Sequence, residues 1–96
     1  MLNYEDFAAA LNTEFVVRLD DRQVAIELVE LTERKTAPGQ EYFSVVFRGP
    51  VDQFLPQMTY DVTHEKYEPS QLFLVPIGQK EDGFLYQAVF NRLVEG

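Results

Sequence analysis

The chain has 96 residues, of which 46% are hydrophobic and 14% aromatic, and its net charge is −8. This length fits a single domain, residues 1–96, and the apolar content is too high for a disordered chain. The absence of cysteine excludes disulfides and thiolate metal sites, and the acidic balance disfavours nucleic acids and anionic membranes as partners. No apolar run approaches the roughly 20 residues of a membrane helix, and no signal-peptide pattern is present, so we expect a cytoplasmic protein.

Residues 3–11 are predicted to form one short helix. Asn3 is a typical N-cap residue, and Asp6 follows it at the spacing of a capping box. Asn12 can end the helix because asparagine tolerates the left-handed conformation. So short a helix is unstable alone, so we expect it to pack as a lid on a sheet. Its apolar face consists of Phe7, Ala10 and Leu11.

Alternating apolar and polar residues predict six strands after the helix. The second of them switches its apolar side between Leu28 and Val29, which predicts a β-bulge. Residues 35–40 contain a Pro38-Gly39 turn and are expected to form a loop. The predicted strands cover about residues 13–19, 23–33, 41–49, 57–63, 71–77 and 84–92.

The connection at residues 51–56 is predicted to be irregular, and its apolar residues Phe54 and Leu55 are expected to lie under the sheet. The strand that follows alternates cleanly and is therefore typical of a half-exposed antiparallel strand. The residues of this strand that we expect to face the core are Met58, Tyr60 and Val62.

Residues 72–77 form an unbroken apolar run, which Pro76 and Gly78 make unsuitable for a helix. Successive side chains of a strand point to opposite faces, so such a run is expected to be covered on both sides, or on one side and by an end-cap on the other. We therefore expect this strand to lie at the centre of the core.

The order of elements predicts the fold class. Strands follow one another without intervening helices, which excludes a parallel sheet. We expect a mainly β fold, a six-stranded antiparallel small barrel or roll with one short N-terminal helix. A two-layer β-sandwich is the alternative.

Candidate catalytic and metal-binding residues are few. The only histidine is His64, and the two serines, Ser44 and Ser70, do not lie in a nucleophile-elbow sequence. The residues that could form a weak divalent-cation site are Asp61, His64, Glu65 and Glu68, whose spacing matches no known ligand pattern. We therefore expect no catalytic, cofactor-binding or metal site.

Arg48 stands out because it ends an apolar strand beside the Gly49-Pro50 turn. We expect its guanidinium to pair with an outward-facing glutamate. The alternative is that it presents its fork of donors to an acidic partner.

Several segments together resemble a family of small bacterial proteins of unknown function, over residues 4–91. The family implies a mostly β domain with a short N-terminal helix and supplies no catalytic residues. The resemblance also implies an accessory or structural role, because such proteins are sometimes encoded near phage-tail-like collar proteins. The matching segments are Tyr4-Glu-Asp-Phe7, Phe15 to Leu19, Phe43-Ser-Val-Val-Phe-Arg-Gly-Pro50, Leu55-Pro-Gln57 with Tyr60, Leu72-Phe-Leu-Val-Pro-Ile-Gly78 and Tyr86-Gln-Ala-Val-Phe-Asn91.

Three functions are compatible with these observations. We expect a non-enzymatic interaction or accessory module, which contacts a protein partner or a second copy through strand edges or through residues such as Val16, Val46 and Phe73. The first alternative is a small-molecule binding barrel, with Tyr60 and Tyr86 as the polar groups of its pocket. The second is a carboxylate-based hydrolase with Asp61, His64 and Glu65.

Overall fold

The computed structural model describes residues 2–32 and 34–93, and within them one helix and seven strands. The predicted helix and all six predicted strands are present, and a seventh short strand forms where a loop was expected. The elements are α1 (Tyr4–Ala9), β1 (Glu14–Arg18), β2 (Gln23–Leu31), β3 (Lys35–Ala37), β4 (Gln40–Gly49), β5 (Met58–His64), β6 (Tyr67–Lys80) and β7 (Gly83–Leu93).

Six of the strands close into an antiparallel barrel. Their order is β2-β1-β5-β6-β7-β4, and β2 pairs with β4 to complete the ring. β3 is not part of this ring; it forms a hairpin with β4 and pairs with residues 40–42 of that strand. The closed ring confirms the predicted small barrel, in place of the sandwich alternative.

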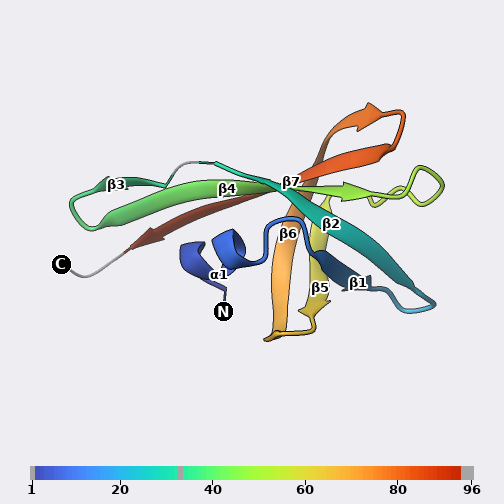
Figure 1. Cartoon of the computed structure of the whole chain (residues 1–96), viewed down its shortest axis with the longest axis horizontal. Coiled ribbons are helices and arrows are strands. Elements are labelled where there is room, and N and C mark those ends of the chain that lie inside the picture. The colour runs from blue at the N-terminus through green and yellow to red at the C-terminus, as the bar shows by residue number, and fades with distance from the viewer. Residues whose placement is uncertain (1, 33, 94–96) are drawn as a thin grey trace.

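Two strands bend from one half of the barrel into the other. Residues 23–27 of β2 pair with β1, and residues 27–31 pair with β4. In the same way, residues 67–74 of β6 pair with β5 and residues 75–80 pair with β7. As a result, β5 and the first half of β6 lie at a steep angle to β4 and β7 (Figure 1).

A bulge accompanies each of these two strands. The register between β2 and β4 shifts between Leu28 and Glu30, which confirms the bulge predicted from the apolar switch. The register between β6 and β7 shifts between Pro76 and Gly78. Because a bulge increases local twist, these two irregularities help the strands to turn the corners of the barrel.

The prediction for residues 71–77 was wrong in two respects. The strand is longer and spans Tyr67–Lys80, and it is not covered on both sides. Leu72 and Leu74 are buried, whereas Phe73 is 51% exposed. The reason is that β6 lies in the single wall of a barrel, so only one of its faces meets the core. The end of the predicted strand 23–33 at Glu33 lies outside the described residues.

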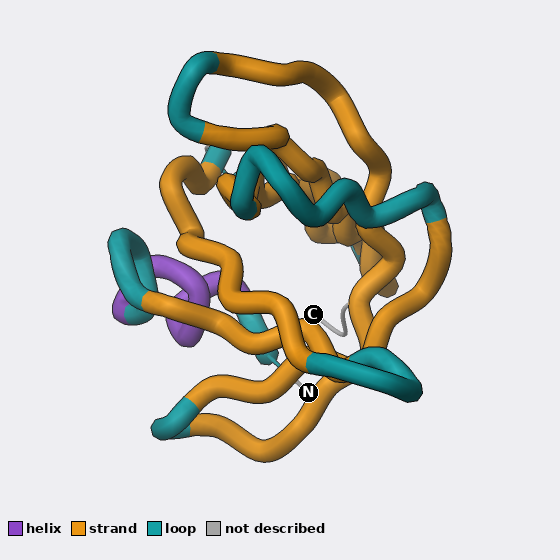
Figure 2. The backbone as a smooth tube through the Cα atoms, turned by 90° about the vertical axis from the view of Figure 1, so that its right-hand side faces the viewer, coloured by secondary structure: helices purple, strands orange, loops and turns teal. Residues whose placement is uncertain are grey.

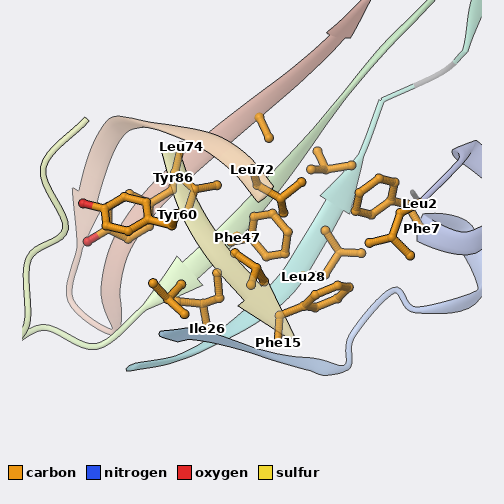
Figure 3. Packing of buried hydrophobic residues seen from close by; sticks show 14 of the residues in the cluster. Leu2, Phe7, Phe15, Ile26, Leu28, Phe47, Tyr60, Leu72, Leu74 and Tyr86 are labelled. Atoms are coloured by element: carbon orange, nitrogen blue, oxygen red, sulfur yellow. The ribbon is translucent and has the colours of Figure 1, made fainter. Parts of the chain in front are cut away.

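The barrel interior is filled by side chains from the strands of both halves (Figure 3). Rings of Phe15 and Phe47 lie with their centroids 5.2 Å apart. Aliphatic side chains of Ile26, Leu28 and Leu74 fill the space around them, each at most 2% exposed. The interior is therefore a packed core.

Helix α1 covers one end of the barrel, as expected. Asn3 and Asp6 form the predicted capping box, with each side chain accepting a hydrogen bond from the other backbone N–H at 2.8 and 3.0 Å. Phe7 is fully buried and lies against rings from β1, β4 and β7. Asn12 adopts φ 67°, which confirms the left-handed end of the helix. Leu11, predicted on the apolar face, is 38% exposed because the chain has already left the helix there.

Candidate functional site

The opposite end of the barrel is covered by residues 50–57, which we call the capping loop. The loop lies at the right of Figure 1 and crosses the end of the barrel that faces the viewer in Figure 2. Leu55 lies under the strands as predicted and is 1% exposed. Phe54 was expected to be buried as well, but it is 49% exposed. Its ring packs against the ring of Phe84, with 5.1 Å between the ring centroids.

Polar contacts hold the capping loop in place. The hydroxyl of Tyr86 accepts a hydrogen bond from the Leu55 N–H at 2.9 Å, and the hydroxyl of Tyr60 donates one to the carbonyl of Pro56. Both hydroxyl groups point out of the core in the same direction, towards the capping loop (Figure 3). Arg22, in the turn between β1 and β2, donates from Nε to the side-chain oxygen of Gln53 at 3.2 Å. These contacts preorganise the loop and keep Phe54 facing solvent.

A groove of about 470 Å³ runs between the capping loop and the turn that joins β1 to β2. Met58, which was predicted to face the core, lines this groove and is 51% exposed. It sits at the first position of β5, where β6 pairs with β5 through Leu74 but the pairing with β1, which covers residues 61–63, does not reach. We call this hollow the loop groove, and its lining comprises Arg18, Leu19, Asp20, Asp21, Arg22, Phe54, Leu55, Pro56, Met58, Thr59, Tyr60, Asp61 and Gln71.

The two tyrosines under the capping loop hold their protons more tightly than exposed tyrosines do. Burial raises the pKa of Tyr60, and the neighbouring Tyr86 raises it further. Burial also raises the pKa of Tyr86, although the hydrogen bond from Leu55 acts in the opposite direction. At neutral pH both groups are therefore neutral hydroxyls that fasten the loop.

These shifts predict a loss of stability at alkaline pH. A phenol whose pKa rises on folding contributes stability that is complete below its ordinary value of 10.0 and disappears as the pH rises through the folded value. We expect the free energy of unfolding, measured with urea across a pH series, to fall above that value. Tyr60→Phe should make the fall shallower, because it removes one of the two buried phenols. Equal slopes in the variant and in the parent protein would contradict the role of Tyr60.

Arg48 forms the pair that the sequence predicted. Its guanidinium donates to Glu27 at 2.8 Å and to Asp82 at 2.9 Å. Glu27 is its direct neighbour on β2, and Asp82 lies in the turn between β6 and β7. The pairing joins three segments of the chain and leaves no open fork for an acidic partner.

His64 is half-buried and occupies a structural position near the end of α1. Thr13 Oγ1 donates its only hydrogen to the carbonyl of Ala10 at 2.6 Å, so His64 Nε2 donates to Thr13 Oγ1 at 2.9 Å. Nδ1 accepts from the Lys66 N–H at 3.1 Å. The ring packs 4.6 Å from that of Phe15. Both ring nitrogens therefore serve the fold.

The other residues that were considered for a metal or hydrolase site do not form a cluster with His64. Asp61 accepts a hydrogen bond from the Gln71 amide at 3.1 Å on the outer face of the barrel, and Glu65 and Glu68 are exposed. Among the residues that the structure describes, no three His, Cys, Asp or Glu side chains form a cluster able to hold a metal ion. Asp61, His64, Glu65 and Glu68 therefore do not form a ligand set.

Both serines have structural hydrogen bonds. Ser44 is buried and its backbone N–H donates to Thr32 Oγ1 at 2.8 Å, while its own hydroxyl lies 3.1 Å from the same oxygen. Ser70 donates to the carbonyl of Glu68 at 3.5 Å. Neither hydroxyl faces a general base.

The loop groove was missed as a site because its apolar residues Phe54, Leu55 and Met58 were expected to lie in the core. One sequence signal was present: Phe54 stands in a segment bounded by Pro50 and Pro56, which cannot extend the flanking strands. An apolar residue in such a segment is a candidate for either a core plug or a contact surface, and here Leu55 and Phe54 divide these two roles.

Within residues 2–32 and 34–93, no helix has the length and hydrophobicity that a membrane span requires. No curated protein and no solved structure matches the sequence. The model of a family described as a domain of unknown function, DUF6916, matches residues 2–90. This match covers nearly the whole barrel together with its helix, in agreement with the resemblance found in the sequence. The chain therefore belongs to the DUF6916 family.

Proposed function

We propose that this protein is a non-catalytic interaction module that binds a protein partner in the loop groove. The observation that carries the proposal is the exposure of Phe54, 49%, on a loop that polar contacts hold in one conformation, and of Met58, 51%, at the start of β5 beside it. Large apolar side chains held in a hollow at the surface are typical of binding sites. A preorganised loop also loses little entropy on binding.

The charges around the groove favour a partner with basic and apolar side chains. Arg22 is already paired with Asp21 at 3.1 Å. Asp20, Asp61 and Arg18 also line the groove, and Arg18 on β1 lies opposite Asp61 on β5, so the three aspartates of the lining outnumber its two arginines by one. Together with the net charge of −8, this border attracts a basic partner and accelerates its association. Such a partner is compatible with the accessory role in a larger, phage-tail-like assembly that we propose.

The alternative functions have less support from the geometry. A small-molecule site inside the barrel requires space and free polar groups, but Phe47 and Leu74 fill the interior and the hydroxyls of Tyr60 and Tyr86 are bonded to the capping loop. A hydrolase requires Asp61 and His64 to act on one substrate, and they bond to different elements. The loop groove is therefore the site that we propose.

Site-specific photocrosslinking tests this proposal. A benzophenone amino acid in place of Phe54, in cells that make the protein naturally, is expected to give one discrete protein adduct. The same probe in place of Leu11, an exposed apolar residue beside α1, is the matched control and should give none of it. Once the partner is purified, Met58→Ala should weaken its binding by about tenfold or more, as expected of a contact at the centre of an interface.

Two outcomes would contradict the groove. The first is the absence of an adduct at position 54, and the second is the same set of adducts from positions 54 and 11. Added salt gives an independent check. Binding of a basic partner to this acidic border should weaken as the salt concentration rises, because screening removes the attraction.

A further inference from the structure

Two neighbouring strands of the barrel separate after pairing over part of their length. β6 pairs with β7 only from Val75 to Lys80. The earlier residues of β6 pair with β5, while residues 88–93 of β7 continue along β4. Because these two segments lie at a steep angle to each other, an opening remains between residues 69–73 of β6 and residues 89–91 of β7 (Figure 1). We call this opening the β6–β7 fork.

A hydrogen bond in the turn after β1 fixes the direction of the backbone groups on this side of the barrel. In a strand, the N–H and C=O of one residue face one neighbouring strand, and those of the next residue face the other. The Leu19 N–H donates to the carbonyl of Arg22 at 2.8 Å, so the main chain of Leu19 faces β2. That of Arg18 therefore faces β5, where it lies opposite Asp61. The main chain of Asp61 in turn faces β1.

The same alternation orients the main chain of β6. Since Asp61 faces β1, the main chain of Tyr60 faces β6, where its register partner is Leu72. Leu72 therefore turns its N–H and C=O towards β5. Its neighbours Gln71 and Phe73 turn theirs away from β5, into the fork.

Hydrogen bonds at β4 orient the other side of the fork. The Thr32 N–H donates to the carbonyl of Ser44 at 2.9 Å, and the Ser44 N–H donates to Thr32 Oγ1 at 2.8 Å. The main chain of Ser44 thus faces away from β7. Val89 lies opposite Ser44, so the two form a non-hydrogen-bonded pair, and the main chain of Val89 faces the fork. Asn91, two residues further along β7, has the same direction.

Both sides of the fork are open strand edges. Within the described part of the chain, β6 has only β5 and β7 as neighbours, and no strand lies in the fork. No backbone group of a described turn, loop or helix bonds to the main chain of these edges either. Such a row of N–H and C=O groups is a template for another extended chain. The residues that present it are Gln71, Phe73, Val89 and Asn91.

A hollow of about 390 Å³ borders the β6 side of the fork, and none of its lining residues is charged. Its apolar floor belongs to the inner side of the barrel wall, where Leu2 and Leu72 are buried. On the outer side of the wall, Phe73 and Val89 are each 51% exposed. A strand added here would contact apolar side chains on both of its faces. The lining of the hollow comprises Leu2, Pro69, Ser70, Gln71, Leu72 and Phe90.

The backbone groups of the fork select an extended polypeptide as its occupant. Alternate residues of the β6 edge each offer one donor and one acceptor, and the backbone of a strand matches this spacing. A small apolar ligand would fill the hollow but leave these groups without partners. A second copy of this chain is disfavoured as the occupant, because two molecules of charge −8 repel each other.

We propose that a partner protein inserts one extended strand into the β6–β7 fork and pairs it with the main chain of Gln71 and Phe73. The strand carries uncharged, largely apolar side chains, because the hollow that receives them is uncharged. The fork lies apart from the loop groove, which is on the β1 side of β5. The added strand would extend the run β1-β5-β6 by one member.

Amide hydrogen exchange of the isolated protein, followed by NMR, tests whether the edge is open. We expect the amides of Gln71 and Phe73 to exchange at least about tenfold faster than the amide of Leu72, which faces β5. Slow exchange of both Gln71 and Phe73 in dilute solution would overturn the fork as a docking site, because the edge would already be covered.

Photocrosslinking combined with a backbone substitution tests the inserted strand. A benzophenone amino acid in place of Phe73, in cells that make the protein naturally, should give a protein adduct. Gln71→Pro removes one N–H of the edge and should reduce this adduct at least about tenfold. Gln71→Ala keeps the N–H and loses only the side-chain bond to Asp61, so it should retain the adduct. The N–H that proline removes does not face β5, so Gln71→Pro should fold, which circular dichroism checks.

Three outcomes would overturn the inserted strand. These are no adduct at position 73, equal adducts in Gln71→Pro and Gln71→Ala, and an adduct with the mass of two copies of this chain. The adduct expected at position 54 should persist in Gln71→Pro, because the loop groove does not use this N–H. Failure of the fork is therefore distinguishable from failure of the loop groove.

Discussion

Gly83→Ala is expected to lower the free energy of unfolding by about 3 kcal/mol or more. Gly83 has φ 152°, a conformation that residues with a side chain rarely adopt. A Cβ atom built at this position lies 2.1 Å from the backbone oxygen of Gly49 and 3.0 Å from Cγ of Arg48. The clash involves backbone, so a change of side-chain rotamer cannot relieve it, and β4 and β7 must separate where they pair.

Gly78→Ala is the matched control for this experiment. Gly78 lies across the same hairpin, at the β6 bulge, and a Cβ atom there has no neighbour within 4 Å. Its substitution is expected to change stability by no more than about 1 kcal/mol. Urea unfolding followed by circular dichroism gives both values. If the two variants lose the same stability, the close approach of Gly83 to β4 is not what requires glycine there.

Phe7→Ala is the second large expected loss, about 3–5 kcal/mol of unfolding free energy, typical of removing a buried phenylalanine ring. The Phe7 ring is fully buried and its centroid lies 6.4, 6.0 and 5.2 Å from those of Phe15, Phe43 and Phe90. These rings belong to β1, β4 and β7. A cavity at Phe7 therefore removes packing contacts with all three strands at the end of the barrel that α1 covers.

Leu11→Ala tests whether the loss comes from this plug or from the helix as a whole. Leu11 stands just after α1 and is 38% exposed, so its truncation should cost about 1 kcal/mol or less. Thermal unfolding of both variants, compared with the parent chain, separates the two explanations. A similar loss in both would mean that Phe7 does not act as the plug of the barrel end.

Local signals in the sequence were sufficient for the helix caps and the β2 bulge. Asn3, Asp6 and Asn12 act through hydrogen bonds and backbone preferences within a few residues, so tertiary structure does not alter them. The change of apolar face between Leu28 and Val29 can also be recognised from the neighbouring residues alone, and it was sufficient to predict the bulge. The closed antiparallel barrel then follows from consecutive strands without helical crossovers.

The direction of individual apolar side chains could not be predicted in the same way. An apolar strand residue indicates burial on folding or burial in a contact, and the sequence does not separate these outcomes. Phe73 lies in an apolar run that was expected to be covered, and it was also a candidate contact residue; it points outward from a wall that is one layer thick. Met58 alternates correctly with Tyr60, but β5 begins at Met58, beyond the residues 61–63 that pair with β1, so one side of Met58 stays open.

The loop groove was beyond prediction because distant residues create it. Tyr86 fixes Leu55 across 31 positions of the sequence, and Arg22 fixes Gln53 across the same separation. Neither pair has a local signature, since each depends on how the barrel closes. Leu55 is held beneath the strands, whereas its neighbour Phe54 stays 49% exposed.

The order of strands in the barrel has a consequence for synthesis on the ribosome. β4 pairs along its length with β7, so Gln40 meets Leu93. Until β7 has emerged, Phe43 and Phe47 have no partner strand on that side, and Phe7 lacks the ring of Phe90 that covers it. Contacts so distant in sequence slow folding and expose apolar surface in the meantime. The nascent chain therefore cannot complete its core until β7 has been synthesised. Until then, its exposed apolar residues can aggregate or bind chaperones.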